Sequence, residues 1–244
     1  MASPPRFSIV VPAHNEEVLL GRGLAAIDRA VRRAGTTAEV VVVANRCTDR
    51  TEHIALAAGA TVVIDDHRNI AATRNAGVAA STGEIVLTID ADTVMHPGAL
   101  VEIDALASGH RFVGGGSRFV LERNSVGLAL TRAVIQLVSV VSRTGGVVYW
   151  CARDDFDAIG GFDESKLFGE DLDFAARLRR HGRRTSGRRF RNVRSSPATV
   201  SVRKFDAYGD WHMFVEAGRM IRHRVTTRGT DTSFADEYFY DFDP

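Results

Sequence analysis

Short apolar runs alternate with amphipathic segments over the first hundred residues. Runs rich in β-branched residues at 7–11, 40–43, 61–64 and 84–89 predict buried strands. Between the first two runs, apolar residues recur at steps of four, three and four, namely at Leu20, Leu24, Ile27 and Val31, and predict a helix that ends at Gly35. Further helices are expected before Gly59 and over residues 70–80. Strands that alternate with helices pair in parallel through right-handed crossovers, so the pattern predicts a doubly wound α/β sheet.

The pattern loosens after Pro97. We expect a helix at 98–107, a strand at 111–114, a long helix from about 126 to 143, a strand at 147–150 and helices at 154–159 and from 169 to about 181. No internal repeat or low-complexity linker interrupts the chain. The sequence therefore predicts one continuous domain over residues 1–230, divided at about 115/116 into a regular first half and a divergent second half. Residues 231–244 form a tail with five acids, five aromatic residues and no Lys or Arg.

Two carboxylates, Asp90 and Asp92, follow the apolar run at 84–89 with only Ala91 between them. The carboxyl end of a strand in an open α/β sheet is where ligands bind. Two acids at that edge suit a hard divalent cation, which takes oxygen ligands and commonly bridges to substrate phosphates. The alternative is that both residues only cap the turn after the strand.

Composition narrows the class of protein. The chain has 244 residues, 45% hydrophobic and 25% charged, with a formal net charge of +1. These values fit a soluble globular protein and argue against a generic nucleic-acid binder. Cys47 and Cys151 are the only cysteines, which excludes a disulfide framework or a structural zinc site. Residues 1–6 lack the apolar stretch of a signal peptide and no window is long enough to span a bilayer, so we expect a cytoplasmic protein with at most peripheral contact at the inner face of the membrane.

Six short motifs occur in a fixed order and together resemble the inverting glycosyltransferases of family 2. They are Ser8-Ile9-Val10-Val11-Pro12-Ala13-His14-Asn15-Glu16-Glu17, Cys47-Thr48-Asp49-Arg50-Thr51, Arg74-Asn75-Ala76-Gly77, Asp90-Ala91-Asp92, Gly160-Gly161-Phe162-Asp163-Glu164 and Gly169-Glu170-Asp171. The resemblance covers roughly residues 7–182. It implies the GT-A fold, a Rossmann-like fold of nucleotide-diphospho-sugar transferases with a mostly parallel central sheet and helices on both faces. It also implies that residues 1–115 bind the nucleotide and residues 116–230 the acceptor.

The resemblance assigns the donor site. It implies that a nucleotide sugar contacts Pro12, Ala13, His14, Asn15, Glu16, Asn45, Arg74, Asp90 and Ala91. Arg74 falls where the family places a cation near the diphosphate, a task that suits the planar guanidinium. Plain turn chemistry is the alternative for His14 and Asn15, and a solvated helix-face charge is the alternative for Arg74.

The resemblance also assigns a metal and a base. It makes Asp92 the direct ligand of Mg²⁺ or Mn²⁺, which offsets charge on the departing diphosphate, and Asp90 a metal ligand or ribose partner. His212 is a weak further ligand candidate. Asp171, with Glu170 beside it, matches the family's base motif at the start of a helix, where the positive end favours a carboxylate. Direct displacement with inversion needs one base on the acceptor hydroxyl. Helix stabilisation alone is the alternative for these two acids.

Two departures from the family pattern matter. Relatives carry an acidic residue that reads the base where this chain has Ala44 and Asn45, so the sequence leaves a UDP-sugar and a GDP-sugar both open. The Gln-x-x-Arg-Trp motif of processive members is missing, which predicts transfer of a single sugar. The acceptor is not identified. Nine arginines and one histidine between residues 177 and 194 could attract an anionic or lipid-linked acceptor, or form a solvated charged face.

Other functions remain open at this point. A catalytically silent nucleotide-sugar binder would share the same donor site, and a retaining GT-A transferase would share the metal motif. A nucleotidyltransferase is disfavoured because residues 12–17 contain no glycine. The tail at 231–244 could fold back on the arginine-rich stretch or stay disordered.

Overall fold

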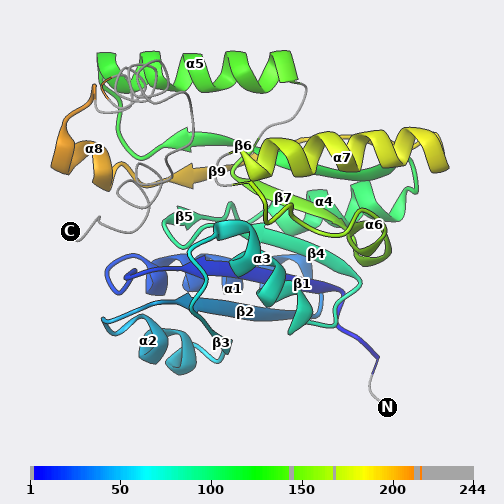
Figure 1. Ribbon diagram of the computed structural model, residues 1–244, viewed down its shortest axis with the longest axis horizontal. Coiled ribbons are helices and arrows are strands. Elements are labelled where there is room, and N and C mark those ends of the chain that lie inside the picture. Colours follow the sequence, from blue (N-terminus) through cyan, green and yellow to red (C-terminus); the bar gives the residue numbers. More distant parts are fainter. Residues whose placement is uncertain (1–2, 143–145, 167–168, 212–214, 216–244) are drawn as a thin grey trace.

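One mixed sheet runs through the molecule (Figure 1). The computed structural model describes residues 3–142, 146–166, 169–211 and 215. Within these residues the strand order is β3-β2-β1-β4-β7-β6-β9-β5, and β8 pairs with β6 off this path. The predicted tail at 231–244 and its fold-back on the arginine-rich stretch lie outside the described residues.

The first half of the sheet is parallel, as the sequence predicts. Its strands are β1 (Phe7–Ala13), β2 (Ala38–Asn45), β3 (Thr61–Asp65) and β4 (Ile85–Ile89). β1 lies between β2 and β4 and is parallel to both. All seven residues of β1 and all five of β4 are buried, as expected for strands covered on both faces. Their carboxyl ends therefore meet at one edge of the sheet.

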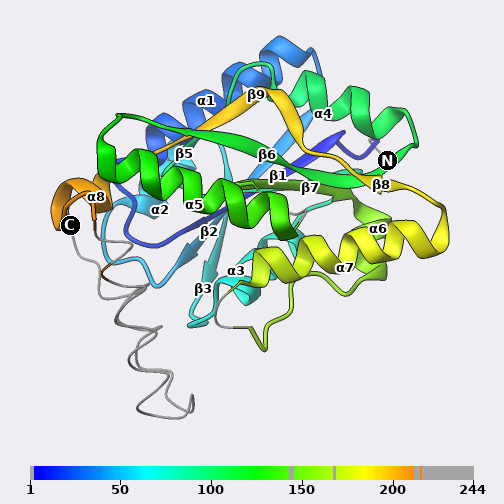
Figure 2. The ribbon, with the colours of Figure 1, turned by 90° about the horizontal axis from the view of Figure 1, so that it is seen from above.

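Helices cover both faces (Figure 2). On one side lie α1 (Leu20–Ala34) and α4 (Ala99–Ser108), and on the other lie α3 (Ile70–Ala79), α6 (Arg153–Ala158) and α7 (Glu170–Thr185). The short α2 (Thr51–Ala57) packs beside α1 and β3. This arrangement confirms the expected α/β architecture.

The second half of the sheet changes strand direction. β7 (Val148–Ala152) is antiparallel to both β4 and β6 (Phe112–Leu121), whereas β9 (Val193–Val200) is parallel to β6. The strand expected at 111–114 is ten residues long, because β6 pairs with β7 along one edge and with β8 and β9 along the other. The sequence pattern did not indicate β5 (Thr93–Val94), β8 (Arg189–Phe190), β9 or α8 (Arg203–Tyr208). The remaining helix is α5 (Val126–Ser142).

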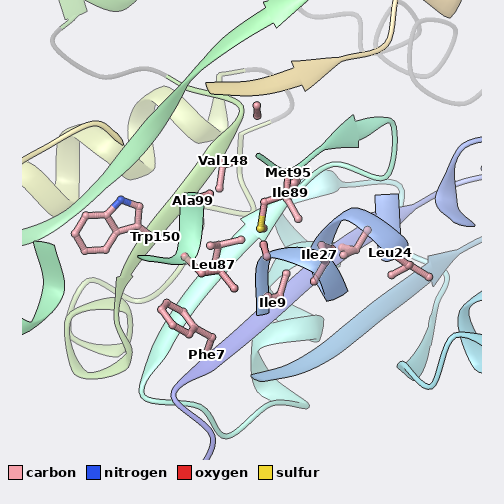
Figure 3. Packing of buried hydrophobic residues seen from close by; sticks show 14 of the residues in the cluster. Phe7, Ile9, Leu24, Ile27, Leu87, Ile89, Met95, Ala99, Val148 and Trp150 are labelled. Carbon is pink, nitrogen blue, oxygen red and sulfur yellow. The ribbon is translucent and has the colours of Figure 1, made fainter. Parts of the chain in front are cut away.

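The core divides by the alternation of side chains along the strands. Phe7, Ile9, Leu87 and Ile89 point to the side of α1 and α4, where Trp150 of β7 joins them (Figure 3). The intervening residues of β1, β4 and β7 pack in the second cluster with α3, α6 and α7, including Val10, Val86, Tyr149 and Cys151. Because both faces are packed, the sheet edge that carries Asp90 is held by rigid strands. No helix in the described part of the chain is long and apolar enough to cross a bilayer.

Candidate active site

The carboxyl ends of β1, β2 and β3 bring predicted donor-site residues together. Nδ1 of His14 lies 2.7 Å from the carbonyl oxygen of Asn45 and donates to it. Asn45 in turn donates through Nδ2 to the Asp65 carboxylate at 2.6 Å and to the carbonyl of His67 at 2.7 Å. Asn45 is 4% exposed, so its amide mainly organises this edge of the sheet.

The loop after β1 is tied to its neighbours. Pro12 and Ala13 are the buried last residues of the strand. Asn15 adopts a left-handed backbone conformation (φ 50°), and its side chain accepts a hydrogen bond from the Thr48 amide at 2.8 Å. The Glu16 carboxylate pairs with Arg203 of α8 at 3.0 Å. The five predicted residues of this loop thus lie where the resemblance places a nucleoside, and their role in binding one stays a prediction.

Asp65 is an acid that the sequence interpretation missed. Burial raises the pKa of Asp65, but hydrogen bonds from His67, Thr73 and Asn45 outweigh this and hold the pKa below its usual value. The same hydrogen bond raises the pKa of the exposed His67 imidazole. An acidic group therefore sits beside Asn45 although the carboxyl end of β2, Ala44 and Asn45, carries none. The signal in the sequence is the Asp65-Asp66-His67 run directly after a strand.

Arg74 links two motifs that lie far apart in the chain. Its guanidinium donates through Nη2 to Asp90 at 3.0 Å and through Nη1 to Glu170 at 2.6 Å. It is 8% exposed and lies over the Phe162 ring, 5.3 Å from its centroid. Burial lowers the pKa of Arg74, and the nearby carboxylates of Asp90 and Glu170 more than offset this, so its pKa is raised. The solvated helix-face alternative for Arg74 is therefore wrong.

Glu170 is the buried member of the predicted base pair. Its side chain is paired with Arg74, and burial raises its pKa although the guanidinium opposes the shift. Because Glu170 is engaged in this ion pair, its neighbour Asp171 is the better-placed base. The aspartate motif of β4 and the acidic motif of α7 therefore meet around one guanidinium.

Asp171 lies at the start of α7, and both of its oxygens accept hydrogen bonds. The Tyr149 hydroxyl donates to Oδ2 at 3.3 Å, and the Leu172 amide donates to Oδ1 at 2.7 Å. Tyr149 is 4% exposed, and burial raises the pKa of its phenol, so the hydroxyl keeps its proton. The sequence interpretation placed residues 147–150 in a strand and did not identify Tyr149 as a site residue. A hydroxyl on the strand that pairs with β4 is the signal that could have indicated it.

The residues around Asp92 suit a cation whose coordination is completed by substrate. The Asp90 side chain is 43% exposed, and the Asp92 backbone carbonyl accepts from Ser201 at 3.2 Å, which fixes the loop between β4 and β5. Within the described residues no three His, Cys, Asp or Glu side chains gather as a metal cage. Mg²⁺ is usually held by one or two carboxylates together with substrate phosphates, so Asp90 and Asp92 fit such an ion. His212 lies outside the described residues.

Asn75 positions the glycine-rich turn beside Arg74. Its amide donates to the Phe162 carbonyl at 2.9 Å and accepts from the Phe162 amide at 2.9 Å. Gly160 and Gly161 both have positive φ, which lets the turn approach α3 closely. This pairing holds Phe162 against the guanidinium.

A family model matches the first part of the chain, which carries the loop after β1, Arg74 and Asp90–Asp92. Residues 8–125 match glycosyl transferase family 2. Over these residues the chain is similar to this family. The family 2 match includes β1 through β6, the Asp90–Asp92 motif and Arg74, and it ends before Tyr149 and Asp171.

Curated family 2 relatives match over a similar length. Uncharacterized glycosyltransferases of Mycobacterium bovis and Mycobacterium tuberculosis are 38% identical over 112 residues, which cover 46% of this chain and 48% of each relative. The chain spans about half the length of these curated relatives.

Solved structures share the fold over most of the chain. TarS residues 1–349 of S. aureus, in complex with UDP-GlcNAc, has a TM-score of 0.61 at 18% identity and covers 80% of this chain and 58% of its own. The mannosyltransferase PcManGT of Pyrobaculum calidifontis, with GDP-Man and Mn²⁺, has a TM-score of 0.63 at 20% identity and coverage of 81% and 57%. Glucosyl-3-phosphoglycerate synthase of Mycobacterium tuberculosis, with Mn²⁺, UDP and phosphoglyceric acid, has a TM-score of 0.59 at 21% identity and coverage of 85% and 74%. The expected GT-A fold is thus confirmed.

Proposed function

We propose that this protein is a metal-dependent, inverting glycosyltransferase that moves a single sugar from a nucleoside diphosphate donor to an acceptor hydroxyl. The observation that carries the proposal is the Arg74 bridge, because one guanidinium contacts both the Asp90 carboxylate and the residue next to Asp171. The motif that contains Asp90 and the motif that contains Glu170 thus lie around one guanidinium, which supports the proposal. In a donor whose diphosphate is held at Asp92, the bond that breaks would lie near the predicted base.

The proposed mechanism assigns one task to each group. Asp171 removes the proton from the acceptor hydroxyl as the new glycosidic bond forms, and the bond from the sugar to the diphosphate breaks with inversion. Asp90 and Asp92 would hold a Mg²⁺ or Mn²⁺ ion, which would supply positive charge to stabilise the leaving diphosphate. Arg74 orients Asp90 and Glu170, while Tyr149 fixes the direction of the Asp171 carboxylate. We propose that the loop of residues 12–16 and Asn45 contact the nucleoside.

The direct test is Asp171→Asn. The amide keeps the shape of the side chain but cannot accept the proton, so release of nucleoside diphosphate should fall by about 10²-fold or more, whereas donor affinity should change little. Asp173→Asn is the matched control, because Asp173 lies in the same helical turn and pairs only with Arg177 among the described residues. Release is measured with UDP-glucose, UDP-GlcNAc and GDP-mannose in the presence of Mn²⁺. Full turnover in Asp171→Asn would remove this residue from the role of base.

Two further readouts separate the competing functions. A catalytically silent binder would be stabilised thermally by UDP or GDP with Mn²⁺ but would release no product from any donor. A retaining transferase would form product whose anomeric configuration, measured by NMR, equals that of the donor. Inversion of that configuration is the result expected here.

The preferred nucleobase can be identified by comparing UDP with GDP in the same thermal assay. The acid near the predicted nucleobase site is Asp65 of β3. The end of β2, where Ala44 and Asn45 stand, does not supply one. Because ligand binding stabilises the folded state by mass action, the preferred diphosphate gives the larger rise in Tm at equal concentration.

A further inference from the structure

The α5 helix carries an exposed apolar stripe. Val126 is 80% exposed, Leu130 45%, Val134 38% and Leu137 63%. Their spacing of four, four and three places them along one flank of the helix. Contiguous apolar surface of this kind on a folded protein marks an interaction site rather than ordinary surface.

The composition of α5 restricts what can cover this stripe. Leu128 and Thr131 face the protein and are buried, and the exposed Ala129 and Ala133 widen the apolar flank. Arg132 is the only charged residue of the helix, which contains no acid. A surface without carboxylates tolerates a negatively charged partner.

Aromatic residues lie at the beginning of the helix. Arg123 pairs with Asp206 and Asp210 at 2.6 and 2.7 Å, which fixes the end of α8 beside the start of α5. Tyr208 and Trp211, on either side of that contact, are 54% and 52% exposed. Tyr and Trp with one apolar and one polar end favour the boundary between water and lipid headgroups.

Exposed arginines lie on α7, a helix on the same side of the sheet as α5. Figure 2 shows α5 and α7 on the same side of β6, with the end of α5 near the start of α7, whereas the exposed arginines lie in the last turns of α7. Arg180, Arg183 and Arg184 of α7 are exposed, and no carboxylate among the described residues forms an ion pair with them. Arg177 and Arg188, in contrast, pair with Asp173 and Asp155 and serve the fold. The arginine-rich stretch is therefore part structural and part exposed cationic surface.

We propose that the α5 stripe and the exposed arginines of α7 form a docking surface for a membrane rich in anionic phospholipid headgroups. The apolar side chains enter the headgroup boundary and the guanidiniums bind the negative surface, a combination that holds peripheral helices on membranes. The inference goes beyond sugar transfer and does not depend on it.

Vesicle flotation with the full chain tests the proposal. Vesicles of phosphatidylcholine with phosphatidylglycerol should carry the protein upward, and pure phosphatidylcholine should carry at least about tenfold less. Leu130→Glu/Leu137→Glu should lower the fraction bound by about tenfold or more, whereas Leu56→Glu on α2, where Leu56 is 55% exposed, should leave it unchanged. Arg183→Glu/Arg184→Glu should abolish the preference for anionic vesicles, with Arg29→Glu/Arg33→Glu on α1 as the charge-matched control.

The remaining outcomes identify another occupant and overturn the proposal. If the full chain does not float and is a dimer by light scattering that becomes monomeric in Leu130→Glu/Leu137→Glu, the stripe binds a second copy. If the full chain does not float but a chain ending at Val215 does, residues 216–244 cover the stripe. Equal loss of flotation in the α5 variant and in Leu56→Glu would also contradict the assignment of this surface. Each variant is first checked for an unchanged Tm, so that unfolding is not mistaken for lost binding.

Discussion

At the scale of single residues, two adjacent carboxylates of the site differ in their surroundings. Glu170 and Asp171 are adjacent, yet the first is buried against Arg74 and the second accepts from Tyr149 and from a backbone amide. Glu170 is engaged in the ion pair with Arg74, and burial raises its pKa. Both hydrogen bonds that orient Asp171 come from neutral donors.

Tyr149→Phe tests the orienting role of the hydroxyl. The substitution keeps the buried ring and removes one hydrogen bond to Asp171, so kcat should fall by about tenfold while the donor KM changes little. A purely structural role would lower Tm and leave kcat of the folded enzyme in place.

The pair of Asp65 and His67 should make this part of the donor site sensitive to pH. The raised pKa of His67 means that its contribution to stability is complete below the unfolded pKa of about 6.5 and is lost as pH rises through the folded value. The lowered pKa of Asp65 means that its contribution is present above about 3.9 and is lost as pH falls through the folded value.

An NMR titration of His67 measures this coupling. Its midpoint should lie above that of a free histidine, and Asp65→Asn should bring it down towards the ordinary value because the charged carboxylate that accepts the hydrogen bond from the imidazole is gone. His53, for which no pairing is seen in the described residues, serves as the internal reference. An identical His67 midpoint in both proteins would contradict the pairing.

At the scale of elements, β6 is the strand on which the second half of the sheet is assembled. It pairs with β7 on one edge and with β8 and β9 on the other, and Gly115 lies in its middle. A Cβ placed on Gly115 would lie 1.7 Å from the carbonyl oxygen of Arg191. The absence of a side chain thus lets the chain after β8 cross close to β6, and this crossing leads β9 towards Asp92.

Gly115→Ala should consequently destabilise the protein by about 3 kcal/mol or more, since backbone rather than a flexible side chain would have to move. Gly109→Ala is the control, because its Cβ would find only ordinary contacts at 3.6 Å and its φ is −75°, which alanine adopts without strain. Urea denaturation compares the two variants with the parent. Equal stability of both variants would mean that β6 and residue 191 separate easily.

At the scale of the whole molecule, Arg74 joins the two halves of the sheet at the site. α3 and β4 belong to the parallel half and α7 packs on β6 and β8, yet Asp90 and Glu170 share one guanidinium. The predicted division into nucleotide and acceptor halves at about residue 115 stays a prediction. The arrangement does imply that stability and site geometry are coupled through this ion pair.

Arg74→Met should cost about 3 kcal/mol of unfolding free energy at pH 7, because it leaves the Glu170 carboxylate buried without its partner. Arg74→Met/Glu170→Gln removes the charge on both sides and should recover much of that loss, while nucleotide release stays low in both variants. Arg32→Met, which breaks the exposed pair with Asp28, should change stability by less than about 0.5 kcal/mol. Denaturant titration measures the unfolding free energy of all three variants. A double variant in which the effects of the two substitutions simply add would disprove the coupling.

The sequence by itself determined the elements of the parallel half and the positions of the motifs along the chain. Buried apolar runs placed β1 to β4 correctly, and the acids at the end of β4 and the start of α7 fell where their spacing indicated. Local periodicity reports how each element is buried, and that is enough to orient a parallel sheet and to identify its functional edge.

Only the tertiary structure decided which side chains meet. Arg74 and Glu170 are 96 residues apart, and Tyr149 reaches Asp171 only because β7 enters the sheet antiparallel to β4. Asp65 supplies an acid next to the end of β2, where Ala44 and Asn45 carry none, because Asn45 is paired with Asp65 in the register of β2 and β3. Such partners depend on strand order and packing across the chain, and no periodicity within a single segment encodes them.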